Sequence, residues 1–165
     1  MLVALVGYMG SGKTTIGHAL ANRLGVSFID LDVAIEQQAG KRIKEIFSSE
    51  GESEFRRIES EVLQQLLNAQ STGILATGGG TPCFFNQIEK LNNRCTTIYL
   101  QCSLETLHQR LAPSAEERPL LSTLKDVEAH FLERVAYYEK AQHKVQADGT
   151  PEDILARIEK IIELT

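Results

Sequence analysis

A glycine-rich segment near the start of the chain, residues 7–14, constrains the fold more tightly than any other part of the sequence. It consists of GYMGSGKT, follows the short apolar run Leu2–Val6 and precedes a stretch whose apolar residues have helical spacing. A strand, a G-x-x-x-x-G-K-S/T segment and a helix, in that order, are typical of the phosphate-binding P-loop. The alternative, a strand-to-helix turn that is merely rich in glycine, is a poor explanation for eight matching positions in this context. The sequence therefore predicts a nucleotide site.

The residue types in this segment indicate how it would bind a nucleotide. Glycine lets the backbone wrap closely around an anion, and the amide N–H groups then face inward at the positive end of the following helix. Lys13 can reach the terminal phosphates, and the Thr14 hydroxyl can ligate Mg²⁺. The residues expected to hold the nucleotide phosphates are Gly10, Ser11, Gly12, Lys13, Thr14 and Thr15.

Composition limits the chain to a few classes of protein. Its 165 residues, 42% hydrophobic and 24% charged, suit one soluble globular domain. A net charge of −5 argues against general binding of nucleic acid or of a membrane surface, and no apolar run could cross a bilayer. The three cysteines suggest neither a disulfide framework nor a zinc site. With no visible signal peptide and no exposed apolar stripe, we expect a cytoplasmic monomer with reduced thiols.

Strand-like and helix-like segments alternate along the whole chain. Expected strands cover residues 2–6, 26–29, 73–77, 96–100 and 144–147. Expected helices cover residues 16–24, 33–39, 43–49, 52–68, 84–91 and 124–141, with Ser103 and Thr150 as N-caps of two more. This alternation predicts one α/β domain over residues 1–165, with a parallel sheet covered by helices on both faces. Residues 112–122, with two prolines and little periodicity, are expected to form a loop.

Asp30 and Asp32 follow the expected second strand, at the sheet edge where ligands of parallel sheets gather. If the chain stays extended there, both carboxylates point the same way. The third expected strand runs into glycine without the acidic residue that usually serves the metal in P-loop proteins, so these two aspartates are the candidates for Mg²⁺. The alternative is that they are turn and N-cap residues of the next helix.

Residues 51–59 are denser in charge than a core helix requires. Arg56 can pair with Glu52 and Glu59 at helical spacing. Arg56 and Arg57 differ by about 100° around a helix, so only one of them can face a given pocket. Taken alone, this segment is equally consistent with a solvated, salt-bridged face.

Further features at the expected binding edge could contact phosphate or another ligand. The triple glycine at 78–80 follows a strand and would let backbone amides approach a ligand closely. Arg118 lies in the expected loop, which suits a lid that closes on the transferred phosphate, with a surface arginine as the alternative. Arg110 ends a helix, where a cation also suits the macrodipole, and Arg134 could emerge at the edge of the core.

Taken together, these motifs resemble the shikimate kinase family, small members of the nucleoside-monophosphate-kinase-like P-loop group. The resemblance covers essentially the whole chain and rests on Asp30-Leu31-Asp32, residues 51–59, residues 78–80, Arg118-Pro119-Leu120 and Arg134. It implies a three-layer α/β/α fold with a five-stranded parallel sheet in the order 2-3-1-4-5. It also implies a substrate-binding segment at about residues 31–60 and a mobile lid at about 112–122. The implied reaction transfers a phosphoryl group from ATP, with Mg²⁺, to the 3-hydroxyl of shikimate in the chorismate pathway.

The resemblance further implies which residues act in the reaction. Asp32, Lys13 and Arg118 would be catalytic, with Arg110 and Arg118 at the nucleotide and Thr14, Asp30 and Asp32 at the metal. The residues implied to contact or surround shikimate are Asp32, Phe47, Phe55, Arg56, Glu59, Gly78, Gly79, Gly80, Pro119 and Arg134.

The chemistry of this acceptor agrees with the residues. A carboxylate suits the planar cationic forks of Arg56 and Arg134, and the reacting hydroxyl requires a carboxylate such as Asp32 to accept its proton. Two positions depart from the usual family pattern. No proline separates Arg134 from the tyrosines that follow it, and residues 148–150 lack the arginine that some members place against adenine. A kinase for gluconate or another small molecule, and a regulatory module that binds ATP without turnover, remain the alternatives.

Overall fold

The computed structural model describes residues 1–112 and 124–164 of the chain. Apart from Ala112, the expected lid at about 112–122 lies outside the described residues, and so do Arg118 and Pro119. The predictions made for these two residues therefore stay predictions.

The strands form a single five-stranded sheet in the described part of the chain. They are β1 (Leu2–Val6), β2 (Phe28–Asp30), β3 (Gly73–Ala76), β4 (Thr96–Gln101) and β5 (His143–Gln146). All neighbouring strands are parallel and the order is β2-β3-β1-β4-β5, so the expected topology is confirmed. All five residues of the central strand β1 are buried, because helices cover the sheet on both faces. The continuous apolar sequence of this strand is what such burial requires.

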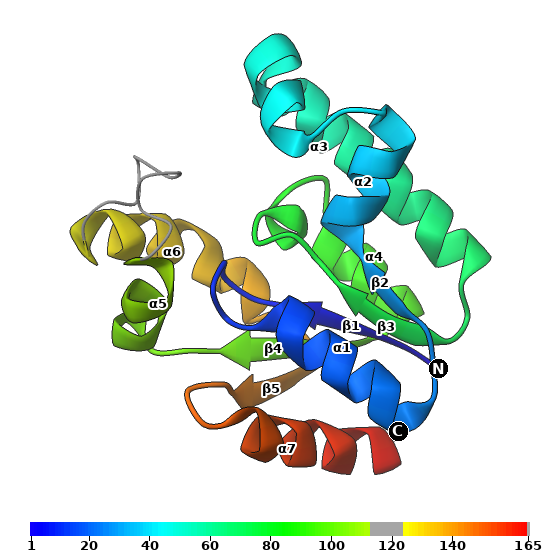
Figure 1. Ribbon diagram of the computed structural model, residues 1–165, viewed down its shortest axis with the longest axis vertical. Coiled ribbons are helices and arrows are strands. Elements are labelled where there is room, and N and C mark those ends of the chain that lie inside the picture. The colour runs from blue at the N-terminus through cyan, green and yellow to red at the C-terminus, as the bar shows by residue number, and fades with distance from the viewer. Residues whose placement is uncertain (113–123, 165) are drawn as a thin grey trace.

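Helices cover both faces of this sheet, as predicted (Figure 1). They are α1 (Lys13–Leu24), α2 (Leu31–Ala39), α3 (Ile43–Ala69), α4 (Gln87–Arg94), α5 (Leu104–Leu111), α6 (Leu124–Tyr138) and α7 (Pro151–Glu163), with a 3-10 turn η1 (Thr81–Cys83). The helices α1 and α7 pack together on one face, and α4 contacts β4 and α3 on the other. The helix α2 and the first half of α3 extend beyond the sheet and form one side of the binding edge (Figure 1).

Several helix ends follow from local residue types. The hydroxyl of Ser103 accepts a hydrogen bond from the backbone of Thr106 at the start of α5, and the hydroxyl of Thr150 does the same for Asp153 in α7. The expected break at Gly51 is also present: φ of 84° and ψ of 173° interrupt α3, so the two predicted helices meet there at a kink.

Two expected elements differ from the structure. The helix expected from residue 33 already begins at Leu31, because Asp30 captures the first free N–H groups of α2. The helix expected over residues 84–91 instead begins at Gln87 as α4, since Phe84 is extended and both Phe85 and Asn86 have positive φ. The remaining expected strands and helices differ from the observed ones by a few residues at their ends.

The carboxyl ends of the strands meet at one edge of the sheet. Asp30 is in register with Ala76, which pairs with Leu5 of β1, and the P-loop follows β1 directly. The two predicted aspartates, the triple glycine and the P-loop are therefore neighbours in space. None of the described helices is both long and apolar enough to span a bilayer.

Candidate active site

The P-loop has the wrapped conformation predicted from its glycines. The backbone φ is 81° at Gly10 and 95° at Gly12, a region that residues with a Cβ rarely adopt. Lys13 is 9% exposed, and its ammonium group donates hydrogen bonds to the carbonyl oxygens of Gly7 and Tyr8, each 2.9 Å long. The cation expected at the terminal phosphates therefore lies inside the loop.

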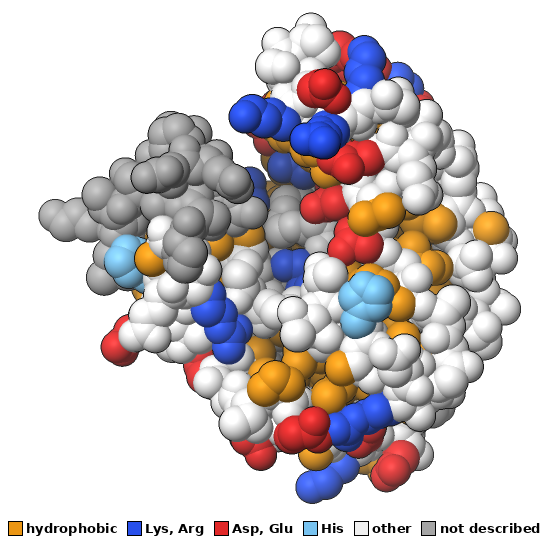
Figure 2. All heavy atoms as spheres, viewed as in Figure 1, with side chains coloured by type: hydrophobic (Ala, Val, Ile, Leu, Met, Phe, Trp, Pro, Cys, Tyr) orange, Lys and Arg blue, Asp and Glu red, His pale blue; other side chains and the backbone are white. Residues whose placement is uncertain are grey.

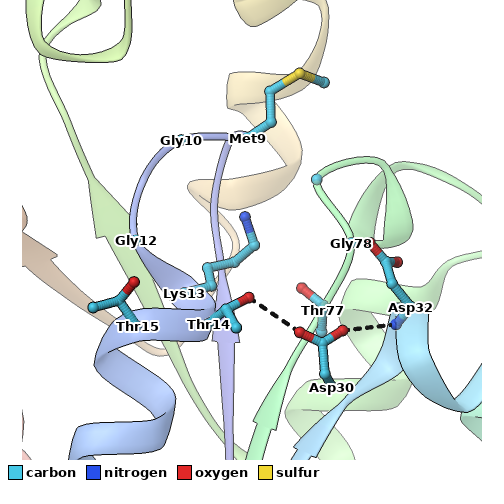
Figure 3. A pocket seen from close by; sticks show the side chains of 11 residues that line it. Met9, Gly10, Gly12, Lys13, Thr14, Thr15, Asp30, Asp32, Thr77 and Gly78 are labelled. Atoms are coloured by element: carbon cyan, nitrogen blue, oxygen red, sulfur yellow. Dashed lines mark hydrogen bonds between the residues drawn. The ribbon is translucent and has the colours of Figure 1, made fainter. Parts of the chain in front are cut away.

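Lys13 faces two aspartates across a cavity of about 290 Å³ (Figure 3). The cavity is built by the P-loop, the start of α1, the junction of β2 and α2, and the end of β3. Its lining residues are Met9, Gly10, Gly12, Lys13, Thr14, Thr15, Asp30, Asp32, Thr77, Gly78 and Gly79. Figure 2 shows a hollow in this face of the molecule, with acidic side chains along one wall and basic side chains at its floor and rim.

Asp30 connects the P-loop helix to α2. Its Oδ1 accepts hydrogen bonds from the backbone N–H groups of Asp32 (3.0 Å) and Val33 (3.5 Å), so the N-cap interpretation is correct for this residue. Its Oδ2 accepts a hydrogen bond from the Thr14 hydroxyl at 3.1 Å (Figure 3). The expectation that both carboxylates project from an extended chain is wrong, because Asp32 lies in the first turn of α2.

The carboxyl group of Asp32 holds its proton more tightly than an ordinary aspartate. Burial on the cavity side raises its pKa to about 6, and repulsion from Asp30 and Glu59 adds to this, whereas Lys13 lowers it. Asp32 lines the cavity and is exposed when the whole residue is considered. Protein groups nevertheless surround part of its carboxyl. At neutral pH this group is mostly ionised and can accept a proton.

The two adjacent arginines of α3 have opposite environments. Arg57 lies on the surface, where its side chain is 54% exposed and pairs with Glu54 and Glu61. The side chain of Arg56 is 8% exposed and donates to Glu59 at 2.9 Å and to Glu52 at 3.3 Å. Glu59 itself is fully buried. The solvated-face interpretation therefore holds for Arg57, and Arg56 is the arginine that faces inward.

Aromatic rings enclose the guanidinium of Arg56. Its Cζ lies 4.9 Å from the ring centroid of Phe55 and 4.3 Å from that of Phe84. The predicted residue Phe47 stacks on Phe55 with ring centroids 4.6 Å apart. Phe47 and Phe55 were expected from the sequence, whereas Phe84 was not; its only signal is an aromatic pair shortly after the triple glycine.

The triple glycine lies close to the side chains of Arg56, Arg134 and Asp32. A Cβ at Gly80 would lie 2.7 Å from Nη1 of Arg56 and closer still to Nη2. A Cβ at Gly79 would lie 3.8 Å from Nη1 of Arg134, and a Cβ at Gly78 would lie 3.2 Å from Oδ1 of Asp32. Gly78 and Gly79 line the cavity that contains Lys13 and Asp32, so the triple glycine connects this cavity to the two predicted arginines beside it.

Contacts from α6 hold Arg134 at this edge. The hydroxyl of Tyr138, one turn further along α6, donates a hydrogen bond of 2.6 Å to the carbonyl oxygen of Gly79. His130, one turn before Arg134, forms a hydrogen bond of 2.6 Å between its Nδ1 and the hydroxyl of Tyr8 in the P-loop. Sequence reasoning assigned no role to His130 or Tyr8. Together these bonds tie α6 to both the P-loop and the triple glycine.

A second cavity of about 370 Å³ lies on the other side of the P-loop. It is lined by Gly10, Ser11, Gly12, Thr15, Ile16, Arg110, Gly149, Pro151 and Ile154. Arg110 donates to the carbonyl oxygens of Gly10 (3.2 Å) and Ala147 (3.0 Å), so it joins the P-loop to the segment after β5. This cavity shares the lining residues Gly10, Gly12 and Thr15 with the cavity that contains Lys13.

The fold and the site define a P-loop kinase: a phosphate-binding loop at the edge of a 2-3-1-4-5 sheet, facing two aspartates across a cavity, with two arginines next to the adjoining triple glycine. A sequence model described as "Shikimate kinase" matches residues 9–163 of the chain. This chain therefore belongs to the shikimate kinase family and is an ATP-dependent kinase.

Individual relatives agree with this assignment. The shikimate kinase of Flavobacterium johnsoniae is 39% identical over 165 residues, covering 93% of this chain and 96% of its own. The shikimate kinase of Azobacteroides pseudotrichonymphae is 47% identical over 119 residues, covering 72% and 70%. A crystal structure of the enzyme from Bacteroides thetaiotaomicron has a TM-score of 0.91 at 32% identity, covering 99% of this chain and 98% of that chain. The enzyme from Acinetobacter baumannii in complex with shikimate has a TM-score of 0.89 at 34% identity, covering 99% and 93%.

Proposed function

We propose that this chain transfers the γ-phosphoryl group of ATP to the 3-hydroxyl of shikimate, giving shikimate 3-phosphate and ADP. The observation that carries the proposal is the single cavity in which Lys13 and Asp32 face each other, bordered by Gly79 with Arg134 behind it. Phosphoryl transfer depends on positioning and charge neutralisation more than on covalent chemistry with the protein, and this arrangement supplies both. The solved relative from A. baumannii that contains shikimate supports the choice of acceptor.

On the donor side, we propose that the P-loop amides and Lys13 hold the phosphates of ATP. The ammonium group of Lys13 now bonds to two neutral carbonyl oxygens, and phosphate oxygens would offer it stronger, charge-assisted hydrogen bonds. The cavity beside Arg110 and Gly149 would take the nucleoside. Arg118 is proposed to add positive charge from the lid.

On the acceptor side, we propose that Arg56 and Arg134 bind the shikimate carboxylate and that Asp32 orients the reacting hydroxyl and takes its proton. Arg56 is held firmly by the buried Glu59, but its bond to Glu52 is long and Glu52 is 55% exposed. A carboxylate of the acceptor can therefore replace Glu52 on that edge of the guanidinium at little cost, since exposed ion pairs contribute little. Phe47, Phe55, Gly78, Gly79, Gly80 and Pro119 would surround the ring.

The oxygen donors beside the P-loop fit Mg²⁺. Thr14 and Asp30 already touch, and Asp32 lies beside them; burial raises the pKa of Asp32 most, and the negative charges of Asp30 and Glu59 add to this. The described residues contain no cluster of three His, Cys, Asp or Glu side chains. That suits Mg²⁺, which is usually bound through one or two carboxylates together with substrate phosphates. We propose Thr14, Asp30 and Asp32 as its holders; when bound, Mg²⁺ would compensate phosphate charge.

The acceptor is best tested by offering shikimate, gluconate and nucleoside monophosphates separately with ATP and measuring ADP release. We expect release to depend on shikimate, because the two arginines suit a carboxylate and the three glycines leave space for a ring. Turnover of gluconate alone would favour the other small-molecule kinase, and ATP binding without turnover of any acceptor would favour the regulatory module.

The pH profile of the reaction should reveal the proposed base. Because the pKa of Asp32 is raised to about 6, we expect kcat/KM for shikimate to rise tenfold per pH unit below that value and to level off above it. The measurement is kcat/KM at saturating ATP from pH 5 to pH 8. A profile that stays flat from pH 5 to pH 7 would count against Asp32 as the base.

Gly80→Ala should weaken shikimate binding in the same way as a substitution of Arg56. The backbone at Gly80 is ordinary, with φ of −89°, so the new Cβ would act only by displacing the guanidinium of Arg56. We expect the KM for shikimate to rise about 10- to 100-fold, with the KM for ATP little changed. In the control Gly149→Ala, the new Cβ meets only Asp153 at 3.5 Å, so shikimate KM should not change.

We further propose that the protein is a single-domain, cytoplasmic monomer that binds neither nucleic acid nor membranes. The acidic net charge of −5 supports this proposal. So does the scattered placement of exposed apolar side chains such as Leu24, Phe85 and Leu132 on separate elements. Light scattering at several concentrations tests the monomer, and a concentration-dependent mass would contradict it.

A further inference from the structure

The guanidinium of Arg56 is held on several sides by groups that fix its plane. Phe55 precedes it on α3, and Phe84 comes from the segment after η1, with its ring centroid nearer, at 4.3 Å. Glu59 binds one edge at 2.9 Å, and the backbone of Gly80 lies against the nitrogens. Of these contacts, Phe84 is the one whose aromatic ring comes from outside α3, and the Cζ of Arg56 lies over that ring.

The backbone after Phe84 is strained. Phe85 and Asn86 have φ of 50° and 53°, and they are the only residues other than glycine with positive φ in the described part of the chain. Such conformations cost free energy and persist where the surrounding structure requires them. The side chain of Phe85 does not offset this cost by burial, since the residue is 57% exposed.

The strained turn places Phe84 while the chain enters α4. Phe84 is extended, with φ of −118°, and its carbonyl oxygen accepts a hydrogen bond of 3.0 Å from the backbone N–H of Gln87. The carbonyl oxygen of Asn86 accepts from the backbones of Glu89 and Lys90 in the first turn of α4. The turn is therefore hydrogen-bonded on both sides of the strained pair, and its geometry directs the Phe84 ring onto Arg56.

We propose that Phe84 is a positioning residue for the acceptor: its ring fixes the plane of the Arg56 guanidinium so that the cation meets the acceptor carboxylate edge-on. This proposal rests on the proposed function of Arg56. A guanidinium binds a carboxylate through two parallel hydrogen bonds only when the two planes coincide, so a freely rotating side chain loses affinity. Stacking on an aromatic face removes that freedom before the acceptor arrives.

The test compares Phe84→Leu with Phe84→Tyr and with the neighbouring Phe85→Leu. Phe84→Leu should raise the KM for shikimate about 5- to 20-fold, while kcat and the KM for ATP stay within about twofold. Phe84→Tyr keeps the ring and should retain the original KM. Phe85→Leu should change nothing, because that ring is exposed. Phe84→Met provides a second non-aromatic variant of adaptable shape, should Phe84→Leu not fold.

A double-mutant cycle then identifies the contact responsible. In the Arg56→Lys background, Phe84→Leu should change shikimate KM by less than about twofold, because an ammonium group has no plane to align. An equal change in both backgrounds, an equal loss in Phe85→Leu, or a fall in kcat at constant KM would overturn the proposal. If the unmodified protein does not phosphorylate shikimate, the proposed function fails and the positioning role fails with it. If it does and Phe84→Leu is unaffected, only the positioning role fails.

Discussion

Asp32→Asn should lower kcat for shikimate phosphorylation by about 10²- to 10⁴-fold, the usual contribution of a positioned general base. Asparagine keeps the shape of the side chain but cannot accept the proton of the reacting hydroxyl. The hydrogen bonds of Lys13 to P-loop carbonyl oxygens and the Thr14–Asp30 hydrogen bond do not involve the Asp32 carboxyl, and Thr14 and Asp30 remain as proposed holders of Mg²⁺, so ATP should still bind. Steady-state kinetics with both substrates, together with nucleotide titration, measure the two effects separately. Full turnover in this variant would remove Asp32 from the base role.

The same substitution should stabilise the protein at neutral pH. Because the folded-state pKa of Asp32 is raised, its stabilising contribution is present below about pH 4 and is lost as the pH rises through about 6. Removing the repelled charge should therefore increase the free energy of unfolding at pH 7 by about 1 kcal/mol, a value reduced by solvent in the cleft. Urea denaturation at pH 4 and pH 7 checks the sign, since the gain should vanish at the lower pH.

Arg56→Ala should weaken shikimate binding by about 2–4 kcal/mol, which is roughly a 30- to 800-fold rise in KM. It should also reduce the free energy of unfolding by about 3–5 kcal/mol, because Glu59 is fully buried and would lose its cation. The adjacent Arg57→Ala is a matched control, since its exposed pairs contribute less than about 1 kcal/mol and face solvent. Kinetics and urea denaturation on both variants give the comparison.

A second substitution separates the two effects of Arg56→Ala. Adding Glu59→Gln removes the buried charge that the first substitution leaves unpaired, while Thr81 can still donate to the side-chain oxygen at this position. The double variant should recover much of the lost stability without recovering shikimate affinity. An unchanged shikimate KM in Arg56→Ala would contradict the assignment of Arg56 to the acceptor, whatever the stability.

Local signals in the sequence were enough for the P-loop, for several helix boundaries and for the alternation of strands and helices. The loop depends on glycine conformations and on the strand and helix next to it, all within a short segment. The caps at Ser103 and Thr150 and the break at Gly51 are likewise decided by residues within one turn. The strand order came instead from the resemblance to a family, because residue patterns do not specify which parallel strands become neighbours.

Contacts between distant segments of the chain decided which side chains of the site lie close together. Helical spacing showed that only one of Arg56 and Arg57 can face inward, but the choice depended on how α3 packs against η1 and α4. The packing of α2 against α3 brings Glu59 towards Asp32, and its charge adds to the effect of burial in raising the pKa of Asp32. Phe84 reaches Arg56 only through the strained turn before α4. The amino-acid sequence by itself determined the phosphate-binding loop and the class of fold, because both rest on short-range geometry. Tertiary structure alone decided which charges meet, because burial and distance between remote side chains leave no periodic pattern along the chain.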